Sequence, residues 1–120
     1  MKEQILNRTK AIGINSLNLL NDLPNNPAGW AIAKQLARCS TSIGANYRAA
    51  IRAKSDLDFI NKLKIVEEET DETLYWLEVI EEMEYIEAEK TKPLYKETNE
   101  ILSIIVATIN TTRKRINNYK

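Results

Sequence analysis

The sequence predicts an all-α fold, a single antiparallel up-down bundle of four helices that takes in residues 1–120 as one domain. Two observations predict it. Apolar or small side chains recur at alternating spacings of three and four along each long segment, as on a helix with one buried face. Polar or proline-bearing breaks separate four such segments, and none alternates with the period of two that a half-buried strand requires.

The first helix is expected over residues 3–21. Its inner face consists of Ile5, Thr9, Ile12, Ser16 and Leu19. The helix should end at the break 21–27, which holds three asparagines and two prolines. Asparagine favours turns, and proline has no N–H to donate to a helix.

The second helix is expected over residues 28–54, with an inner face of Ala33, Leu36, Ser40, Ile43, Tyr47 and Ile51. Many of its side chains are small, and Gly44 lies in its middle. A glycine there costs a helix about 1 kcal/mol relative to alanine, so we expect a neighbouring backbone to approach closely at this point.

The third helix is expected over residues 56–85, because Ser55 followed by two aspartates is typical of a capped N-terminus. Its inner face is Phe59, Leu63, Val66, Thr70, Thr73, Leu77 and Ile80. The fourth helix is expected over residues 92–117, with Thr91 as cap and Pro93 in the first turn. Its inner face is Leu94, Thr98, Ile101, Ile105, Ile109, Thr112 and Ile116.

Composition restricts the chemistry. The chain has no histidine, the commonest general base and metal ligand, and its single cysteine forms no internal disulfide. We therefore predict a protein that is not an enzyme and needs no cofactor or metal. An alternative is a magnesium-dependent hydrolase that uses Glu68, Glu69 and Glu72. No apolar run approaches the ~20 residues of a membrane span, so we expect a cytoplasmic protein without a membrane partner.

Two stretches resemble a known family. The segment QLARCSTSIGANYR at residues 35–48 resembles the signature QL-R-S-x-S-I-x-A-N of the four-helix-bundle family first described as 23S rRNA intervening-sequence proteins. Residues 58–63, DFINKL, with Glu69, Glu72, Thr73, Tyr75, Trp76 and Leu77, resemble its second signature, D-F-x-x-K-L followed by E-x-x-E-T-x-Y-W-L. Two positions depart from the pattern: Cys39 replaces a frequent Ser, and Ala49 a frequent Glu.

The resemblance implies a cytoplasmic bacterial bundle that assembles as a homopentameric ring. The chain is also similar to the accessory variability determinant of diversity-generating retroelements, a basic pentamer that binds nucleic acid and a reverse transcriptase. For most members of the family no activity is established. A salt bridge that depends on the Glu replaced by Ala49 is not expected here.

Charge is segregated although the formal net charge is zero. Residues 23–55 hold five basic and no acidic residues, and residues 56–89 hold thirteen acidic residues and two lysines. On the second helix Lys34, Arg38, Arg48 and Arg52 fall within about 80° of one another at about 100° per residue. This basic ridge suits RNA phosphates, as does the C-terminal cluster Arg113, Lys114 and Arg115.

Two structural interpretations compete with RNA contact. The ridge pairs with acidic residues on the third helix, where Glu67, Asp71, Glu78 and Glu82 share one side, either within a subunit or between subunits. The C-terminal cluster, in turn, stabilises the negative end of the fourth helix. A sequence pI near 6.3 favours charge pairing.

The third helix carries more apolar residues than one inner face needs. Ile65, Trp76, Val79 and Met83 share a second sector about 100° from that face, interrupted by Glu69 and Glu72. We interpret this sector as a self-association surface, the alternative being a wider core within one subunit. The sequence thus predicts a non-catalytic homo-oligomeric scaffold whose partner is RNA or a nucleic-acid-handling protein. The second hypothesis is a purely structural bundle whose charged ridges pair between subunits.

Overall fold

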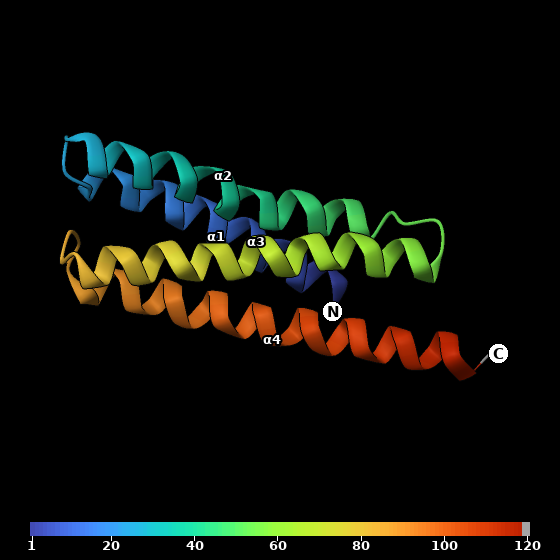
Figure 1. The fold of residues 1–120 in the computed structure, drawn as a ribbon. Helices are drawn as coiled ribbons and strands as arrows, with labels where there is room; N and C mark the ends of the chain where they lie inside the picture. The colour runs from blue at the N-terminus through green and yellow to red at the C-terminus, as the bar shows by residue number, and fades with distance from the viewer. Residues whose placement is uncertain (119–120) are drawn as a thin grey trace.

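The computed structural model describes residues 1–118, and it confirms the all-α four-helix fold. The helices are α1 (Lys2–Leu19), α2 (Pro27–Ala50), α3 (Asp56–Glu82) and α4 (Ala88–Asn118), with a short 3-10 turn η1 (Leu20–Asp22) after α1. Successive helices run antiparallel (Figure 1), and the described residues form no strand. The molecule is a rod of 54 × 21 × 20 Å.

The core follows the helical spacing of the sequence. On α1 all five inner residues are at most 8% exposed, and the inner residues of α3 and α4 are buried except Phe59 and Ile116, which are half-buried. Eight serine and threonine side chains lie in this core, and six threonine hydroxyls donate to carbonyls of their own helices. The hydroxyls of Ser16 and Ser40 are buried without a hydrogen-bond partner among the described residues.

Three helix ends differ from the sequence-based expectation by three or more residues. Helix α2 ends at Ala50, four residues early, and tight backbone bonds such as Ala53 N–H to the Ala50 carbonyl turn the chain away. Arg52 therefore lies in a turn beyond the helix. Helix α3 ends at Glu82, and Glu84 follows with a φ of 56°, in the left-handed region.

Helix α4 begins at Ala88, four residues before the position that Thr91 and Pro93 indicate. Thr91 is not the cap. Its side chain is 1% exposed and its hydroxyl donates to the Ala88 carbonyl, so the preceding turn is already helical. Burial of Ile86 and Thr91 holds this turn against the bundle, and Pro93 is accommodated inside the helix without its N–H bond. The Ser55 cap is present, with its hydroxyl accepting the Asp58 N–H at 3.1 Å.

Glycines bring α1 and α2 close together. A Cβ placed on Gly44 would lie 3.2 Å from the Lys10 backbone nitrogen, and one on Gly13 would lie 3.3 Å from the Thr41 Cα. The backbone of α1 thus passes directly over Gly44, which is the close approach that the small residues of α2 predict. This packing determines which residues of α1 lie beside the basic residues of α2.

Candidate functional site

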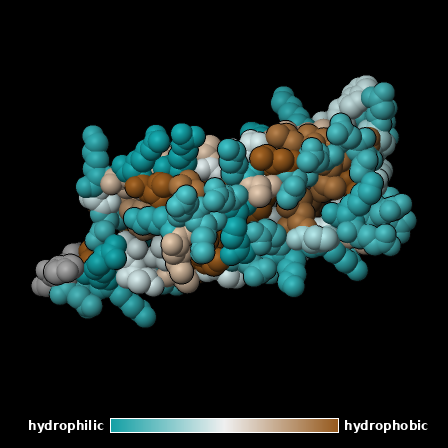
Figure 2. All heavy atoms as spheres, turned by 180° about the vertical axis from the view of Figure 1, so that it is seen from behind, coloured by the Kyte–Doolittle hydropathy of each residue, from teal (hydrophilic) through white to brown (hydrophobic). Residues whose placement is uncertain are grey.

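A groove between α1 and α2 brings three cations together. It has a volume of about 550 Å³, and Lys10, Arg48 and Arg52 line it beside the exposed apolar residues Ile14 and Leu17. No acidic side chain is among the described residues that line it. Figure 2 views the molecule from behind, and hydrophobic surface lies there in separate areas between hydrophilic side chains. The groove combines positive charge with apolar contact surface.

Lys10 escapes the sequence analysis because α1 carries only three basic residues and one acidic residue, too few to form a basic ridge of its own. The signal that could have found it is Gly44. A glycine four residues before Arg48 admits the neighbouring backbone, and that backbone is the one at Thr9 and Lys10.

Arg38 of the predicted basic ridge forms ion pairs with two carboxylates of α3. Its guanidinium donates to the Glu69 carboxylate at 3.2 Å and also to the Glu72 carboxylate. The hydrogen bond from Arg38 lowers the pKa of Glu72 below its ordinary value. Because two carboxylates neutralise the charge of this arginine locally, it should attract a phosphate only weakly.

The acidic partners differ from the ridge proposed from sequence. That ridge comprised Glu67, Asp71, Glu78 and Glu82, yet Arg38 pairs with Glu69 and Glu72. Glu78 instead accepts a hydrogen bond from the Tyr95 hydroxyl of α4 at 2.9 Å. The rotation of α3 about its axis, set by its buried residues, decides which acidic residues meet α2.

The other predicted RNA contacts divide into two groups. Arg115 pairs with Asp56 at the start of α3 at 2.9 Å, and its hydrogen bond lowers the pKa of that carboxyl. Lys34, Arg48, Arg52, Arg113 and Lys114 are exposed, and they form no ion pair with another residue in the range 1–118. Lys34, Arg113 and Lys114 do not line the α1/α2 groove, so of these exposed cations only Arg48 and Arg52 belong to it.

The apolar sector of α3 is partly absorbed by its own subunit. Trp76 and Val79 are half-buried against the core, and the Trp76 indole N–H donates to Glu72 at 3.2 Å. Ile65 and Met83 are 42% and 50% exposed. The Arg38 ion pairs lie between Ile65 and Trp76 along the helix, so the exposed apolar surface is interrupted.

The remaining reactive side chains have structural surroundings. Cys39 is fully buried, burial raises the pKa of its thiol, and the Thr73 hydroxyl donates to its sulfur at 3.3 Å. Glu69 and Glu72, considered above as magnesium ligands, are the partners of Arg38. Within residues 1–118 no three acidic or cysteine side chains gather closely enough to hold a metal ion.

A family model described as 23S rRNA-intervening sequence protein matches residues 1–107. This chain belongs to the 23S rRNA-intervening sequence protein family. A similar solved structure is a protein of unknown function from the S23 ribosomal protein family of Bacteroides thetaiotaomicron. The two chains share 36% identity with a TM-score of 0.81, over 88% of this chain and 97% of the other. No curated protein matches the chain.

The two signature segments of this 23S rRNA-intervening sequence protein meet in the structure. The first contributes Arg38 and Cys39 on α2, and the second contributes Glu69, Glu72 and Thr73 on α3. The ion pairs and the hydroxyl-to-sulfur hydrogen bond described above join them. In this chain these signature residues therefore hold α2 against α3. The similarity to the retroelement accessory protein stays a prediction.

Proposed function

We propose that this chain is a non-catalytic scaffold protein that self-associates, as a pentamer if it follows the family resemblance, and contacts RNA through the α1/α2 groove. The observation that supports RNA contact most directly is the groove itself, where Lys10, Arg48 and Arg52 come together without an acidic neighbour in the lining. Arg38 and Arg115 contribute less, because carboxylates of the same chain already pair with them.

The physical basis is release of counterions. Each RNA phosphate that a lysine or arginine neutralises releases condensed cations, so affinity falls as salt rises. Arginine also matches phosphate geometry with two parallel N–H donors. Contacts of this type hold the backbone and read no base, so we expect binding with little sequence preference.

The test is charge reversal in the groove. The double variant Arg48→Glu and Arg52→Glu is compared with a control of equal charge change, Lys64→Glu and Lys92→Glu, whose lysines are exposed and away from the groove. Affinity for a single-stranded RNA is measured by fluorescence anisotropy from low to high salt. We expect the slope of log K against log salt concentration to become shallower by roughly 0.7 for each phosphate contact removed. The slope of the control variant should stay close to that of the original protein. Binding that ignores salt, or equal loss in both variants, contradicts the proposal.

Self-association is supported by the α3 surface. Ile65 on α3 and Met83, the residue directly after it, are exposed apolar residues of a strongly acidic segment. The α1/α2 groove is basic and also apolar. Two different, complementary patches are what a closed ring requires of each subunit. The variants Ile65→Glu and Met83→Glu should lower the mass measured by light scattering. Leu57→Glu, on the same helix and 63% exposed, is the matched control.

Pairing of charges between subunits is the competing function. If the basic groove serves only the next subunit, Arg48→Glu with Arg52→Glu splits the oligomer and no RNA binds to either protein. The ion pairs of Arg38 support a structural role for part of the predicted ridge, although they lie within one subunit.

A further inference from the structure

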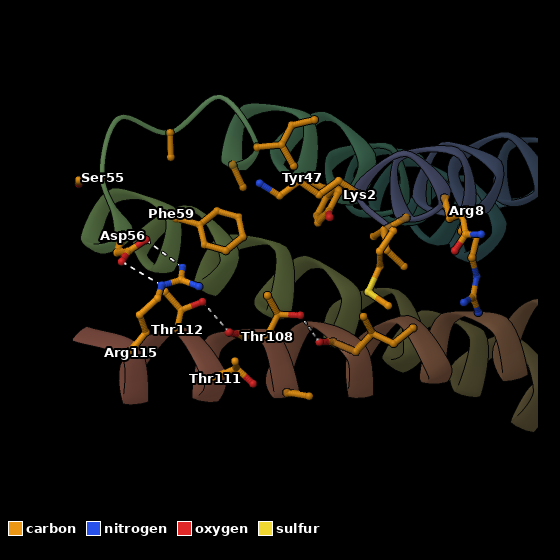
Figure 3. Close-up of a pocket in the computed structure, with 18 of the residues that line it drawn as sticks. Lys2, Arg8, Tyr47, Ser55, Asp56, Phe59, Thr108, Thr111, Thr112 and Arg115 are labelled. Atoms are coloured by element: carbon orange, nitrogen blue, oxygen red, sulfur yellow. Dashed lines mark hydrogen bonds and ion pairs between the residues drawn. The ribbon is translucent and has the colours of Figure 1, made fainter. Parts of the chain in front are cut away.

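A large cleft of the described structure lies at the end of the bundle opposite η1. It has a volume of about 820 Å³ and runs between the first turns of α1 and the last turns of α4, with the α2–α3 connection closing one end. Figure 3 shows the Phe59 ring pointing into it from α3, with Thr108, Thr111 and Thr112 along the α4 side. This volume is in the range of small-molecule sites.

The cleft exists because the helices are unequal. Helix α1 has 18 residues and α4 has 31, and α4 runs on past the start of α1 (Figure 1). Small residues of α4, such as Ala107 and Thr111, line the space beside α1. The groove of RNA contact is on another side, between α1 and α2, and it shares only Ile51 with this cleft.

Apolar groups line much of the cleft. Ile5 is buried at its base, and Phe59 and Ile104 are half-buried along its walls. A ligand with an apolar body would cover the exposed parts of Phe59 and Ile104 and remove them from water.

The charge at the cleft is positive. Lys2, Arg8, Lys54 and Arg115 line it, and Asp56 is the one acidic residue of the described lining. Asp56 pairs with Arg115, and Arg8 pairs with Glu97 of α4. Lys2 and Lys54 form no ion pair with another residue in 1–118, and the Lys2 ammonium is 5.7 Å from the centre of the Phe59 ring. Asp58, outside the lining, pairs with Lys62 and accepts the Lys54 backbone N–H at 3.4 Å. Within the described lining itself neither lysine has a carboxylate partner, because Asp56 pairs with Arg115.

We propose that this cleft binds an anionic amphiphile, specifically an alkyl carboxylate whose head group pairs with Lys2 and Lys54 and whose chain lies along Phe59 and Ile104. The charge selects the head group, because a carboxylate supplies an acidic partner that neither lysine has within the described lining of the cleft. The apolar wall selects the chain. Each additional buried methylene should tighten binding about fourfold until the cleft is filled.

The experiment uses 11-(dansylamino)undecanoate as a fluorescent probe of the full chain. Octanoate, decanoate and dodecanoate are titrated as competitors, below the concentrations at which they form micelles, against decanol and decyltrimethylammonium. We expect competition to strengthen with chain length and to follow the order carboxylate, alcohol, ammonium. No fluorescence change, or equal competition by carboxylate and ammonium, overturns the proposal. Binding to phosphatidylglycerol vesicles without binding of the free carboxylates overturns it as well.

Two variants locate the site. Ala107→Trp fills the cleft from an exposed position on α4 and should abolish probe binding. Lys54→Glu, in the α2–α3 connection, should weaken the binding of the carboxylates at least tenfold and leave the binding of decanol unchanged. Lys92→Glu, on α4 and away from the cleft, is its control. Circular dichroism melts verify that each variant folds. Probe binding unchanged in both cleft variants refutes the site. Because Lys54 does not line the α1/α2 groove, RNA affinity should fall no more in Lys54→Glu than in the control, which separates this proposal from the proposed function.

Discussion

Glu84→Gly should stabilise the protein, because Glu84 ends α3 in a conformation that favours glycine. The Tyr85 N–H donates to the Ile80 carbonyl at 3.1 Å and the Glu84 N–H to the Glu81 carbonyl at 3.0 Å, the paired bonds of a Schellman motif. This motif holds Glu84 at a φ of 56°. A side chain in this region costs about 1 to 2 kcal/mol, which glycine avoids.

The gain is partly offset in the unfolded chain. Glycine loses about 0.5 to 1 kcal/mol more conformational free energy on folding than a residue with a side chain. The free energy of unfolding should therefore rise by about 0.5 to 1 kcal/mol, which in a chain of this size raises Tm by roughly 2 to 5 °C. Differential scanning calorimetry measures both quantities.

Two control variants separate backbone strain from charge. Glu84→Gln removes the carboxylate, which is unfavourable at a helix C-terminus, but keeps the Cβ. Glu84→Ala keeps the Cβ and removes the rest of the side chain. If backbone strain at a φ of 56° is the cause, Glu84→Gly should raise the Tm clearly more than Glu84→Gln or Glu84→Ala does. A Tm for Glu84→Gln as high as that for Glu84→Gly, or a lower Tm for Glu84→Gly, refutes the reasoning.

Two further predictions concern buried hydroxyls and acid stability. Ser40→Ala should raise the free energy of unfolding, measured by urea denaturation, by up to about 1 kcal/mol, because it removes a buried hydroxyl that has no hydrogen-bond partner among the described residues. Thr98→Val, whose hydroxyl donates to the Leu94 carbonyl at 2.7 Å, should give no such gain, and a loss in Ser40→Ala contradicts the assignment. The Arg8 hydrogen bond lowers the pKa of Glu97, so this pair stabilises the fold above the unfolded pKa of about 4.3, and the contribution is lost as pH falls through the folded value. The stability difference between the original protein and Glu97→Gln should shrink from pH 7 to pH 3, and an equal difference at both pH values would show that the ion pair is not its source.

The helix interiors are readable from the sequence because the information is local. Residues such as Ile12 and Ser16 on α1, or Ile101 and Ile105 on α4, repeat at the helical period and must face the same neighbour. The helix ends depend on packing across the bundle. Thr91 resembles a cap by its place before Pro93, but its burial against the core extends α4 backwards by a turn.

The candidate site was less predictable, for a geometric reason. The sequence places Arg38 and Arg48 on one side of α2, and it leaves open which neighbouring helix meets them. The close packing at Gly44 brings Lys10 beside Arg48, and the rotation of α3 gives Arg38 two carboxylate partners. One part of the ridge is thus structural, and another part lines an open groove.

No helix among residues 1–118 is both long enough and apolar enough to traverse a membrane. The α1/α2 groove and the end cleft are both positively charged, and we propose RNA phosphate for the first and an alkyl carboxylate for the second. Variants of Arg48 and of Lys54 therefore report on separate properties of one small bundle.

The most direct test of the central claim is the native mass of the freshly purified protein, determined with and without nuclease treatment. A self-associating RNA-binding scaffold should give a whole multiple of the 13.8 kDa chain after nuclease, together with additional mass that absorbs at 260 nm before it. A single 13.8 kDa species with no nucleic acid before treatment would contradict both self-association and RNA contact.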